Sequence, residues 1–388
     1  MKLTVGRNEL WRGIETVLDV VPAKPAMPIL SNLLLHAEGD RLSLAATDLD
    51  LSIKTSVAAT VEEGGTVTVP ARTLAEIARE WPETALHIAV EGERIHLSGR
   101  LGTDAGGEGA YTLSGMSAEE FPEMPTSLDG LSIDWTRLPA IDGDSLSKMI
   151  DRTAFAVSKD DTRPVLNGVF WRLGEDGMDM VATDGSRLAC YRRNLDLKDQ
   201  VEGQGPSEVI VPPKSLNQLV KLIGKQHEVE HVTLDRSQIL FDMGDAQLLT
   251  RLIEGPYVDY GQVIPQDNNK DLRISNEQLL PAVRRVSILS SSYTRQVRMR
   301  LGSGSVELSA SSQELGGDAR EQLPAVYQDD EMEIGFNATY LLEILRKLDS
   351  SEVHFAFNNP VTAVLVRPVD QGPDEDYFCL LMPLRPSG

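Results

Sequence analysis

The same order of sequence motifs occurs three times along the chain, and this repetition limits the folds that the chain can adopt. Met27–Ile53 and Arg163–Cys190 each contain an apolar strand pattern, a turn of Gly and Asp, a second strand pattern and the tripeptide Ala-Thr-Asp. Arg295–Gly317 repeats the pattern more faintly, with Ser-Ala-Ser in place of Ala-Ala-Thr. Internal repeats of this kind indicate consecutive copies of one structural unit.

Helical patterns flank the strands of every copy. Apolar residues recur every three or four positions, as in an amphipathic helix. We expect a first set of helices within Arg7–Val21, Asp144–Lys159 and Ser275–Ser291, and a second set within Val67–Trp81, Val209–Ile223 and Glu333–Leu348. Alternating strand patterns close each copy. Such blocks of helices and meandering strands predict an α+β fold with antiparallel sheets.

Two segments rich in turn residues separate the copies, namely Phe121–Gly130 and Val263–Asp271. We therefore expect three similar tandem domains, with boundaries at residues 1–127, 128–268 and 269–388.

Several polar residues have positions typical of helix caps or turns. Ser215 and Asn337 are predicted N-caps, and Ser275 with Gln278 fits a capping box. Pro281 lies inside that helix pattern, where it should kink the helix or delay its start. Asp48 and Asp184 end the Ala-Thr-Asp tripeptides. Because an Asp at a strand end bonds its own turn backbone, we interpret both as turn formers rather than catalytic acids.

Composition indicates a globular chain, with 41% apolar and 25% charged residues. No apolar run approaches the roughly 18–20 residues of a membrane span, and the N-terminus has no signal-peptide pattern. The two cysteines, Cys190 and Cys379, are too few for a disulfide framework and lie in apolar strand patterns. We expect buried thiols in a cytoplasmic protein.

One stretch, His227–His231, matches the His-Glu-x-x-His pattern of zinc proteases. The pattern binds zinc only on a helix, where both histidines share one face. Here it runs into an alternating strand pattern, which would separate His227 from His231 by about 13 Å. A zinc hydrolase that uses His227, Glu228 and His231 is therefore only the alternative hypothesis. No phosphate-binding loop or nucleophile elbow occurs, and we expect no cofactor.

Basic residues recur on equivalent helices although the net charge is −22. An acidic chain as a whole should avoid nucleic acid, and a solvated helix face is the simplest explanation of a basic run. The second helices nevertheless carry Arg72 and Arg79, then Lys214, Lys221 and Lys225, then Arg346 and Lys347. This repetition favours helices that gather on one side and face a polyanion.

Several motifs in one order resemble the bacterial DNA polymerase III β subunit, the sliding clamp, over roughly residues 1 to 385. They include "MPILSNLLL", "TDLDLSI", "RPVLNGV", "ATDGSRLA", "VIVPPKSLNQL", "EIGFNATYLLEIL" and the tail "MPLR". The resemblance implies three domains of the DNA-clamp fold and two chains closed head to tail into a ring. Helices would line the hole and antiparallel sheets would form the outside. Such a clamp encircles double-stranded DNA, performs no chemistry and keeps a polymerase on its template.

The resemblance also assigns residues to three surfaces. DNA-facing positions would be Lys24, Arg72, Arg163 and Lys214. The contact between subunits would involve Tyr111, Leu113, Ile288 and Leu289. A groove would bind short peptides of the Gln-Leu-Ser-Leu-Phe type from the polymerase, the clamp loader and repair factors. Its residues would be Leu166, Thr183, Gly185, Ser186, Arg187, Leu188, Val258, Val263, Asn337, Tyr340, Val361, Leu380, Leu381, Met382, Pro383 and Leu384. The Gly102–Gly109 loop and the tail Pro386-Ser387-Gly388 extend beyond the family pattern.

Overall fold

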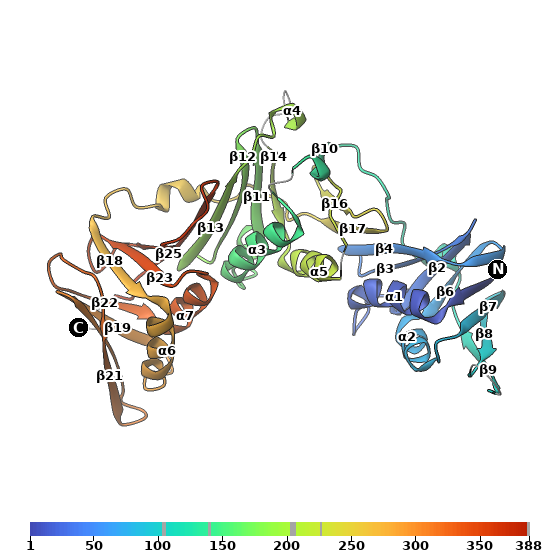
Figure 1. Ribbon diagram of the computed structural model, residues 1–388, viewed down its shortest axis with the longest axis horizontal. Coiled ribbons are helices and arrows are strands. Elements are labelled where there is room, and N and C mark those ends of the chain that lie inside the picture. The colour runs from blue at the N-terminus through green and yellow to red at the C-terminus, as the bar shows by residue number, and fades with distance from the viewer. Residues whose placement is uncertain (103–105, 139–140, 202–206, 226, 386–388) are drawn as a thin grey trace. The chain divides into compact units, whose positions relative to one another are not determined.

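The computed structural model describes residues 1–102, 106–138, 141–201, 207–225 and 227–385. Loop residues 103–105 and tail residues 386–388, which the sequence analysis singled out, lie outside this part of the chain. Helices and antiparallel sheets alternate along the chain, which confirms the predicted α+β class (Figure 1). By their internal contacts the residues form two compact units, Met1–Leu146 with Lys214–Leu252, and Ser147–Pro213 with Ile253–Gly388.

Among its described residues, the first unit contains two antiparallel sheets and the three α-helices α1 (Arg7–Val17), α2 (Ala71–Glu80) and α5 (Pro213–Gly224). A five-stranded sheet has the order β5 (Thr60–Glu63), β1 (Lys2–Gly6), β7 (Ala85–Glu91), β8 (Arg94–Arg100), β9 (Glu108–Ser114). An eight-stranded sheet has the order β10 (Leu131–Asp134), β15 (His231–Leu234), β16 (Gln238–Asp242), β17 (Ala246–Arg251), β4 (Leu51–Ala58), β3 (Arg41–Thr47), β2 (Asn32–Glu38), β6 (Gly65–Pro70).

The second unit repeats this plan. Its eight-stranded sheet has the order β14 (Ser207–Val211), β11 (Val169–Gly174), β12 (Gly177–Thr183), β13 (Arg187–Asn194), β25 (Glu375–Leu381), β24 (Val364–Pro368), β23 (Glu352–Phe357), β18 (Lys270–Ser275). A four-stranded sheet has the order β21 (Gly317–Pro324), β20 (Ser305–Ser312), β19 (Gln296–Gly302), β22 (Met332–Asn337). Helices α4 (Lys198–Val201), α6 (Asn276–Ser287) and α7 (Ala338–Lys347) belong to this unit, and α3 (Gly143–Thr153) connects the two units along the chain.

Each long sheet joins strands of two successive repeats. In the first unit β4 pairs with β17, with Ile53 opposite Leu248. In the second unit β13 pairs with β25, with Leu188 opposite Leu380. In both cases the strand that follows the repeated turn of one copy pairs with the last strand of the next copy. The central copy therefore contributes strands to both units, and the division at residues 127 and 268 stays a prediction.

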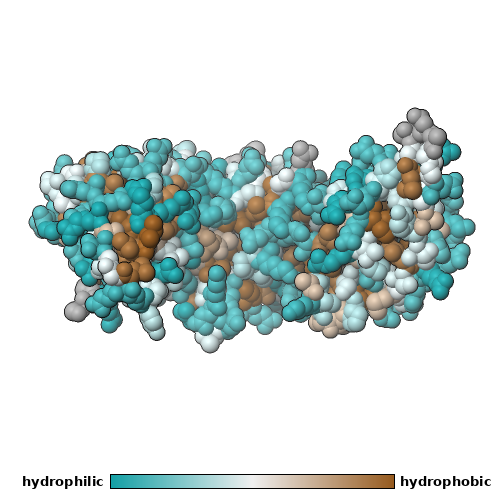
Figure 2. All heavy atoms as spheres, turned by 90° about the horizontal axis from the view of Figure 1, so that it is seen from below, coloured by the Kyte–Doolittle hydropathy of each residue, from teal (hydrophilic) through white to brown (hydrophobic). Residues whose placement is uncertain are grey.

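The helices cover the sheets through the apolar faces that the sequence predicted. Leu10, Ile14 and Val17 of α1 are fully buried, as are Leu341 and Leu345 of α7. Side chains packed in this way stabilise short helices that would be marginal in isolation. The opposite faces are polar, and the surface in Figure 2 is mostly hydrophilic with separate hydrophobic patches.

Two of the three predicted N-caps are confirmed, and the third is wrong. Asn337 is an N-cap, and its Oδ1 accepts a hydrogen bond from the Thr339 N–H at 2.9 Å. Ser215 lies inside α5, which begins two residues earlier at Pro213, a residue suited to a helix start. Ser275 is the N-cap of α6 but its side chain makes no capping bond. Helix α6 also begins at Asn276 and continues through Pro281, so the proline does not delay its start.

The repeated Ala-Thr-Asp turn has the same hydrogen bonds in both copies. Asp48 Oδ1 accepts from the backbone N–H groups of Asp50 and Leu51 at 3.1 and 2.8 Å. Asp184 Oδ1 accepts from Ser186 and Arg187 at 2.8 and 3.1 Å. Each carboxylate therefore satisfies two turn donors, which supports the interpretation as turn formers.

Both thiols are buried and free, as predicted. Burial raises the pKa of each, that of Cys379 to about 12, so both stay protonated at neutral pH. In the described residues, no helix is long and apolar enough to cross a membrane.

Replacing Asp48 should destabilise the first unit. Asp48→Ala leaves two turn N–H groups without their acceptor and should lower the free energy of unfolding by about 1–3 kcal/mol. Asp48→Asn keeps an acceptor oxygen and should cost less. Asp50→Ala is the matched control, because the exposed Asp50 side chain accepts none of these turn bonds. Denaturant unfolding measures the differences, and equal midpoints for Asp48→Ala and Asp50→Ala would contradict the turn role.

Candidate peptide-binding groove

An apolar groove lies within the second unit, where the repeated turn of β12 and β13 meets β25. Its cavity measures about 350 Å³, which is within the usual range for ligand pockets. The lining residues are Arg163, Leu166, Thr183, Gly185, Arg187, Leu188, Val258, Asp259, Tyr260, Val263, Ala363, Leu380 and Met382. All of them belong to the second unit.

The floor of the groove belongs to a buried hydrophobic cluster on one face of the eight-stranded sheet of the second unit. Leu188 and Leu380 are opposite each other on β13 and β25 and are 3% exposed. They belong to a buried cluster with Phe170, on which the rings of Tyr257 and Tyr260 pack with centroids 5.0 and 5.9 Å away. The floor is therefore rigid, because neither leucine can move without opening this cluster.

The walls are more exposed than the floor. Val258, Val263 and Met382 are 43%, 55% and 43% exposed, which is unusual for apolar side chains of this size gathered around one cavity. Val258 and Val263 come from the segment that ends in the short 3₁₀ helix Tyr260–Val263. Such a floor and rim suit a ligand that covers the exposed apolar surface.

Gly185 leaves the turn side of the groove open. Its φ of 89° lies in the left-handed region, which glycine adopts without strain. A Cβ at this position would be 3.1 Å from Arg163 Nη1. The equivalent residue of the first copy is Leu49, which adopts a φ of 84°. The same turn thus carries a side chain in one copy and an open position in the other.

Arg187 connects the turn to α7. Its guanidinium pairs with Asp184 at 3.2 Å and with Glu343 of α7. It also lies over the rings of Phe155 and Tyr340, with its Cζ 5.2 and 4.6 Å from their centroids. Although Arg187 is only 8% exposed, its charge is compensated on two sides. A buried charge of this kind fixes its neighbours, because the loss of one partner is costly.

The groove carries little titratable chemistry. Burial, together with the nearby Asp179 carboxylate, raises the pKa of Tyr260 to about 12, so the phenol stays neutral. Asp184 accepts turn hydrogen bonds and pairs with Arg187, which occupies the carboxylate. The arrangement can bind apolar side chains, and none of its described groups is poised as a nucleophile or base.

The structure brings many of the predicted groove residues together. Leu166, Thr183, Gly185, Arg187, Leu188, Val258, Val263, Leu380 and Met382 line one cavity. Arg163, which the resemblance placed at the DNA, also lines this groove and pairs with Asp160 at 3.1 Å. Asp259, Tyr260 and Ala363 also line the cavity and were not predicted from the sequence. Asp259 and Tyr260 lie between the predicted Val258 and Val263, so their position was a usable signal.

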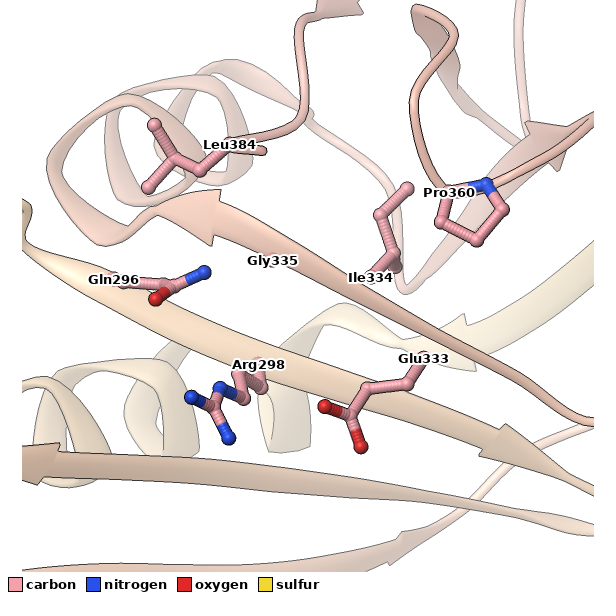
Figure 3. A pocket seen from close by; sticks show the side chains of 7 residues that line it. All are labelled: Gln296, Arg298, Glu333, Ile334, Gly335, Pro360 and Leu384. Atoms are coloured by element: carbon pink, nitrogen blue, oxygen red, sulfur yellow. The ribbon is translucent and has the colours of Figure 1, made fainter. Parts of the chain in front are cut away.

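The remaining predicted groove residues do not line this cavity. Leu381 is fully buried in the sheet, and Ser186 accepts a backbone hydrogen bond from Met382 at 2.9 Å. Tyr340 stacks on Arg187, whereas Val361 is 59% exposed. Asn337 caps α7 and half-buried Pro383 follows Met382. Leu384 donates its backbone N–H to Gly335 at 2.8 Å and lines a separate, smaller cavity (Figure 3).

The other predicted surfaces contain exposed residues. Lys24 and Arg72 are exposed, and within the described part of the chain neither forms an ion pair. Lys214 pairs with Asp48, and Lys221 of the same helix pairs with Asp19 at 2.6 Å. Tyr111 on β9 and Ile288 after α6 are 45% and 70% exposed, whereas Leu113 and Leu289 are half-buried.

The His-Glu-x-x-His stretch is not a zinc site. His227 lies in a loop and its Nδ1 pairs with Asp245 at 2.8 Å, whereas His231 begins β15 and is exposed. Among the described residues, no group of three or more His, Cys, Asp or Glu side chains is placed to hold a metal. The geometry gives the zinc hydrolase alternative no support.

Comparison with known proteins covers nearly the whole chain. The family descriptions of the DNA polymerase III beta subunit match residues 1–125 for the N-terminal domain, 140–259 for the central domain and 261–385 for the C-terminal domain. The beta sliding clamp of Caulobacter vibrioides is 36% identical over 99% of this chain and 100% of its own length. That of Synechococcus elongatus is 32% identical over 99% of both chains.

Solved structures agree with this match. The DNA polymerase III subunit beta of Pseudomonas aeruginosa has a TM-score of 0.89 and 31% identity, covering 99% of this chain and 100% of that one. The DNA polymerase sliding clamp of Bacillus subtilis also has a TM-score of 0.89, with 27% identity and coverage of 100% and 99%. The chain therefore belongs to the DNA polymerase III β subunit family of sliding clamps, whose members are not enzymes but processivity factors.

Proposed function

We propose that this chain is a sliding clamp that closes around double-stranded DNA as a head-to-tail homodimer. It would tether the replicative polymerase to DNA without performing chemistry, and the clamp loader and repair factors would bind it through the apolar groove. Cys190 and Cys379 are buried and form no disulfide, as expected for a protein of the reducing cytoplasm.

The proposed ring rests on one observation. Successive copies pair their strands in the same way twice within the chain, and the two strands that would form a third pairing of this kind are left at sheet edges. The strand after the repeated turn pairs with the last strand of the next copy twice, as β4 with β17 and β13 with β25. The third such strand is β21 and the last strand of the first copy is β9, and each ends its sheet. Unpaired strand edges seek partners. Pairing β21 of one chain with β9 of a second chain, twice, closes a two-fold ring.

The exposed side chains near these edges support this junction. Tyr111 lies on β9 itself. Leu289 is close to the start of β21, since a Cβ on Gly317 would be 3.5 Å from its side chain. Ile288 is adjacent to it and is 70% exposed, which is unfavourable for an isoleucine unless a second chain covers it.

A ring needs only weak contacts with DNA, because its topology keeps it on the duplex. Lys214 and Lys221 each have a carboxylate neighbour in the chain, which reduces the charge they present to phosphate. Lys24 and Arg72 form no ion pair within the described residues, so they should attract phosphate more strongly than Lys214 and Lys221 do. Non-sequence-specific phosphate contacts of this kind position a protein on DNA and leave it free to slide.

Ile288→Asp should weaken the dimer. The substitution places a charge in both junctions of the ring, and burying an unpaired carboxylate there is unfavourable. We expect dimerisation to be at least about tenfold weaker, since central apolar residues often contribute more than 1 kcal/mol. Sedimentation equilibrium measures the change. Val361→Asp, at an apolar residue that is 59% exposed in the loop between β23 and β24, is the control. Equal dimerisation of both variants would refute the junction.

Replacing Lys24 and Arg72 together with Ala should weaken DNA binding and reduce its salt dependence. Each lost phosphate contact lowers the slope of log K against log salt by about 0.9, so the double variant should lose about 1.8. Anisotropy of a labelled duplex between about 50 and 200 mM salt measures this slope. Arg300→Gln removes an exposed cation that pairs with Glu331 and serves as control. An unchanged slope in the double variant would contradict the assignment.

Met382→Ala with Leu384→Ala should abolish peptide binding and leave the ring assembled. Met382 forms part of the exposed wall of the groove, and its loss removes apolar surface that the ligand would cover. We expect at least about a tenfold loss of affinity for a labelled Gln-Leu-Ser-Leu-Phe peptide, measured by anisotropy. Val326→Ala should leave the affinity unchanged. Unchanged affinity in the double variant would refute the groove assignment.

A further inference from the structure

The three lysines of α5 and of the residue that follows it are all bound to acceptors from the first copy of the repeat. Residues seven and eleven positions apart share one side of a helix, and Lys214, Lys221 and Lys225 have this spacing. Their acceptors are the carboxylate of Asp48, that of Asp19 at 2.6 Å and the backbone oxygen of Glu15 at 2.8 Å, in this order. All of these residues belong to the first unit (Figure 1).

The Asp48 carboxylate serves the turn and the helix at the same time. Its Oδ1 accepts the turn N–H groups of Asp50 and Leu51, and its Oδ2 pairs with Lys214. The Asp48 side chain is 12% exposed, whereas that of Lys214 is 61% exposed. The turn therefore holds the carboxylate in place, and the lysine is the partner that can move away.

A single difference between the copies makes this carboxylate available to α5. In the second copy, Asp184 Oδ2 pairs with Arg187 of its own turn at 3.2 Å. Leu51 is the equivalent of Arg187, since each donates the last N–H to its turn carboxylate. Leucine has no charge, so the second oxygen of Asp48 pairs outside the turn, with Lys214.

A carboxylate and a DNA phosphate are alternative partners for the same ammonium group. An exposed ion pair is weak, so phosphate can displace Asp48 from Lys214. A lysine that binds phosphate releases a condensed cation from the DNA. The carboxylate that it leaves behind attracts a cation from solution, which offsets this release. A paired lysine therefore adds less to DNA affinity, and to its salt dependence, than an unpaired one.

We propose that Asp48 and Asp19 are internal competitors of DNA phosphate, which take back Lys214 and Lys221 when a phosphate contact breaks. This inference rests on the proposed function, in which α5 faces the duplex. Because a lysine that leaves a phosphate regains a partner in the chain, each contact breaks more easily and the ring slides with less resistance. The two aspartates are positioning residues, since they act on DNA only through the lysines.

Asp48→Asn tests the competition directly. The amide keeps Oδ1 as the acceptor of the turn and removes the charge that holds Lys214. We expect the slope of log K against log salt to become steeper by about 0.9, as for one added phosphate contact. The gain in duplex affinity should then be about threefold larger at 50 mM than at 200 mM salt. Anisotropy of a labelled duplex with the full chain measures both values.

Asp50→Asn is the matched control for charge. Asp50 lies in the same turn, is exposed, and forms no ion pair within the part of the chain that the structure describes. Its replacement removes the same charge, and it should change the slope much less than Asp48→Asn does. Equal changes would overturn the proposal, because they would show that the aspartates act only through a general repulsion of DNA.

Lys214→Gln is the second control, because it removes the partner through which Asp48 acts. In a chain that carries this substitution, Asp48→Asn should no longer steepen the slope. A purely structural role of Asp48 would lower the midpoint of denaturant unfolding in both backgrounds and would not steepen the slope in either. The pair of Asp19→Asn and Lys221→Gln repeats the cycle at a residue that holds no turn, in case Asp48→Asn does not fold.

The outcomes separate this inference from the proposed function. If the unmodified chain binds DNA with a clear salt dependence but neither aspartate variant steepens the slope, the competition is refuted and the DNA-binding surface stands. Steepening that persists when the paired lysine is replaced also refutes the competition. If the unmodified chain does not bind the duplex, the proposed DNA-binding surface and the competition both fail.

Discussion

Antiparallel pairing between successive repeats is the constraint on which the structure depends. A strand edge exposes backbone groups that need partners, and each repeat supplies such an edge to the next. The pairing of β13 with β25 also sets Leu188 opposite Leu380, so the junction itself makes the floor of the groove. The same rule, applied to β21 and β9, leads to a closed dimer. One kind of hydrogen-bonded contact thus accounts for the long sheets, the groove and the proposed ring.

The repeated turns differ in the basic side chains that their aspartates pair with. Arg187 is buried, and its pairs with Asp184 and Glu343 bind the repeated turn to α7. Lys214 is exposed but pairs with Asp48, which belongs to the equivalent turn of the first copy. The two turns therefore place basic residues differently, in the groove in one case and on a helix surface in the other. An acidic chain can in this way keep basic side chains local and weakly attractive to DNA.

The local elements were predictable because they depend on short-range patterns. Apolar periodicity gave the helices, and the Asp at each strand end gave the turns, since its carboxylate bonds N–H groups only two or three residues away. Helix starts were harder to predict. Ser215 and Ser275 both have side chains that can cap a helix. Helix α5 nevertheless begins at Pro213, before Ser215, and the side chain of Ser275 makes no capping bond to α6. Arg163 was assigned to the DNA by resemblance, and the structure adds that it lines the groove, so its contact with DNA stays a prediction.

The sequence by itself determined the threefold repeat, the α+β class, the turn role of Asp48 and Asp184, and the family. These properties reside in order and spacing along the chain. The resemblance had already grouped Leu166, Val258 and Met382, but only the tertiary structure decided which residues of the predicted set line the cavity, since these residues are far apart in sequence. It also decided that Arg300 pairs with Glu331, whereas Arg298 on the same strand forms no ion pair within the described residues. Register and neighbouring strands set such differences, and a one-dimensional pattern does not contain them.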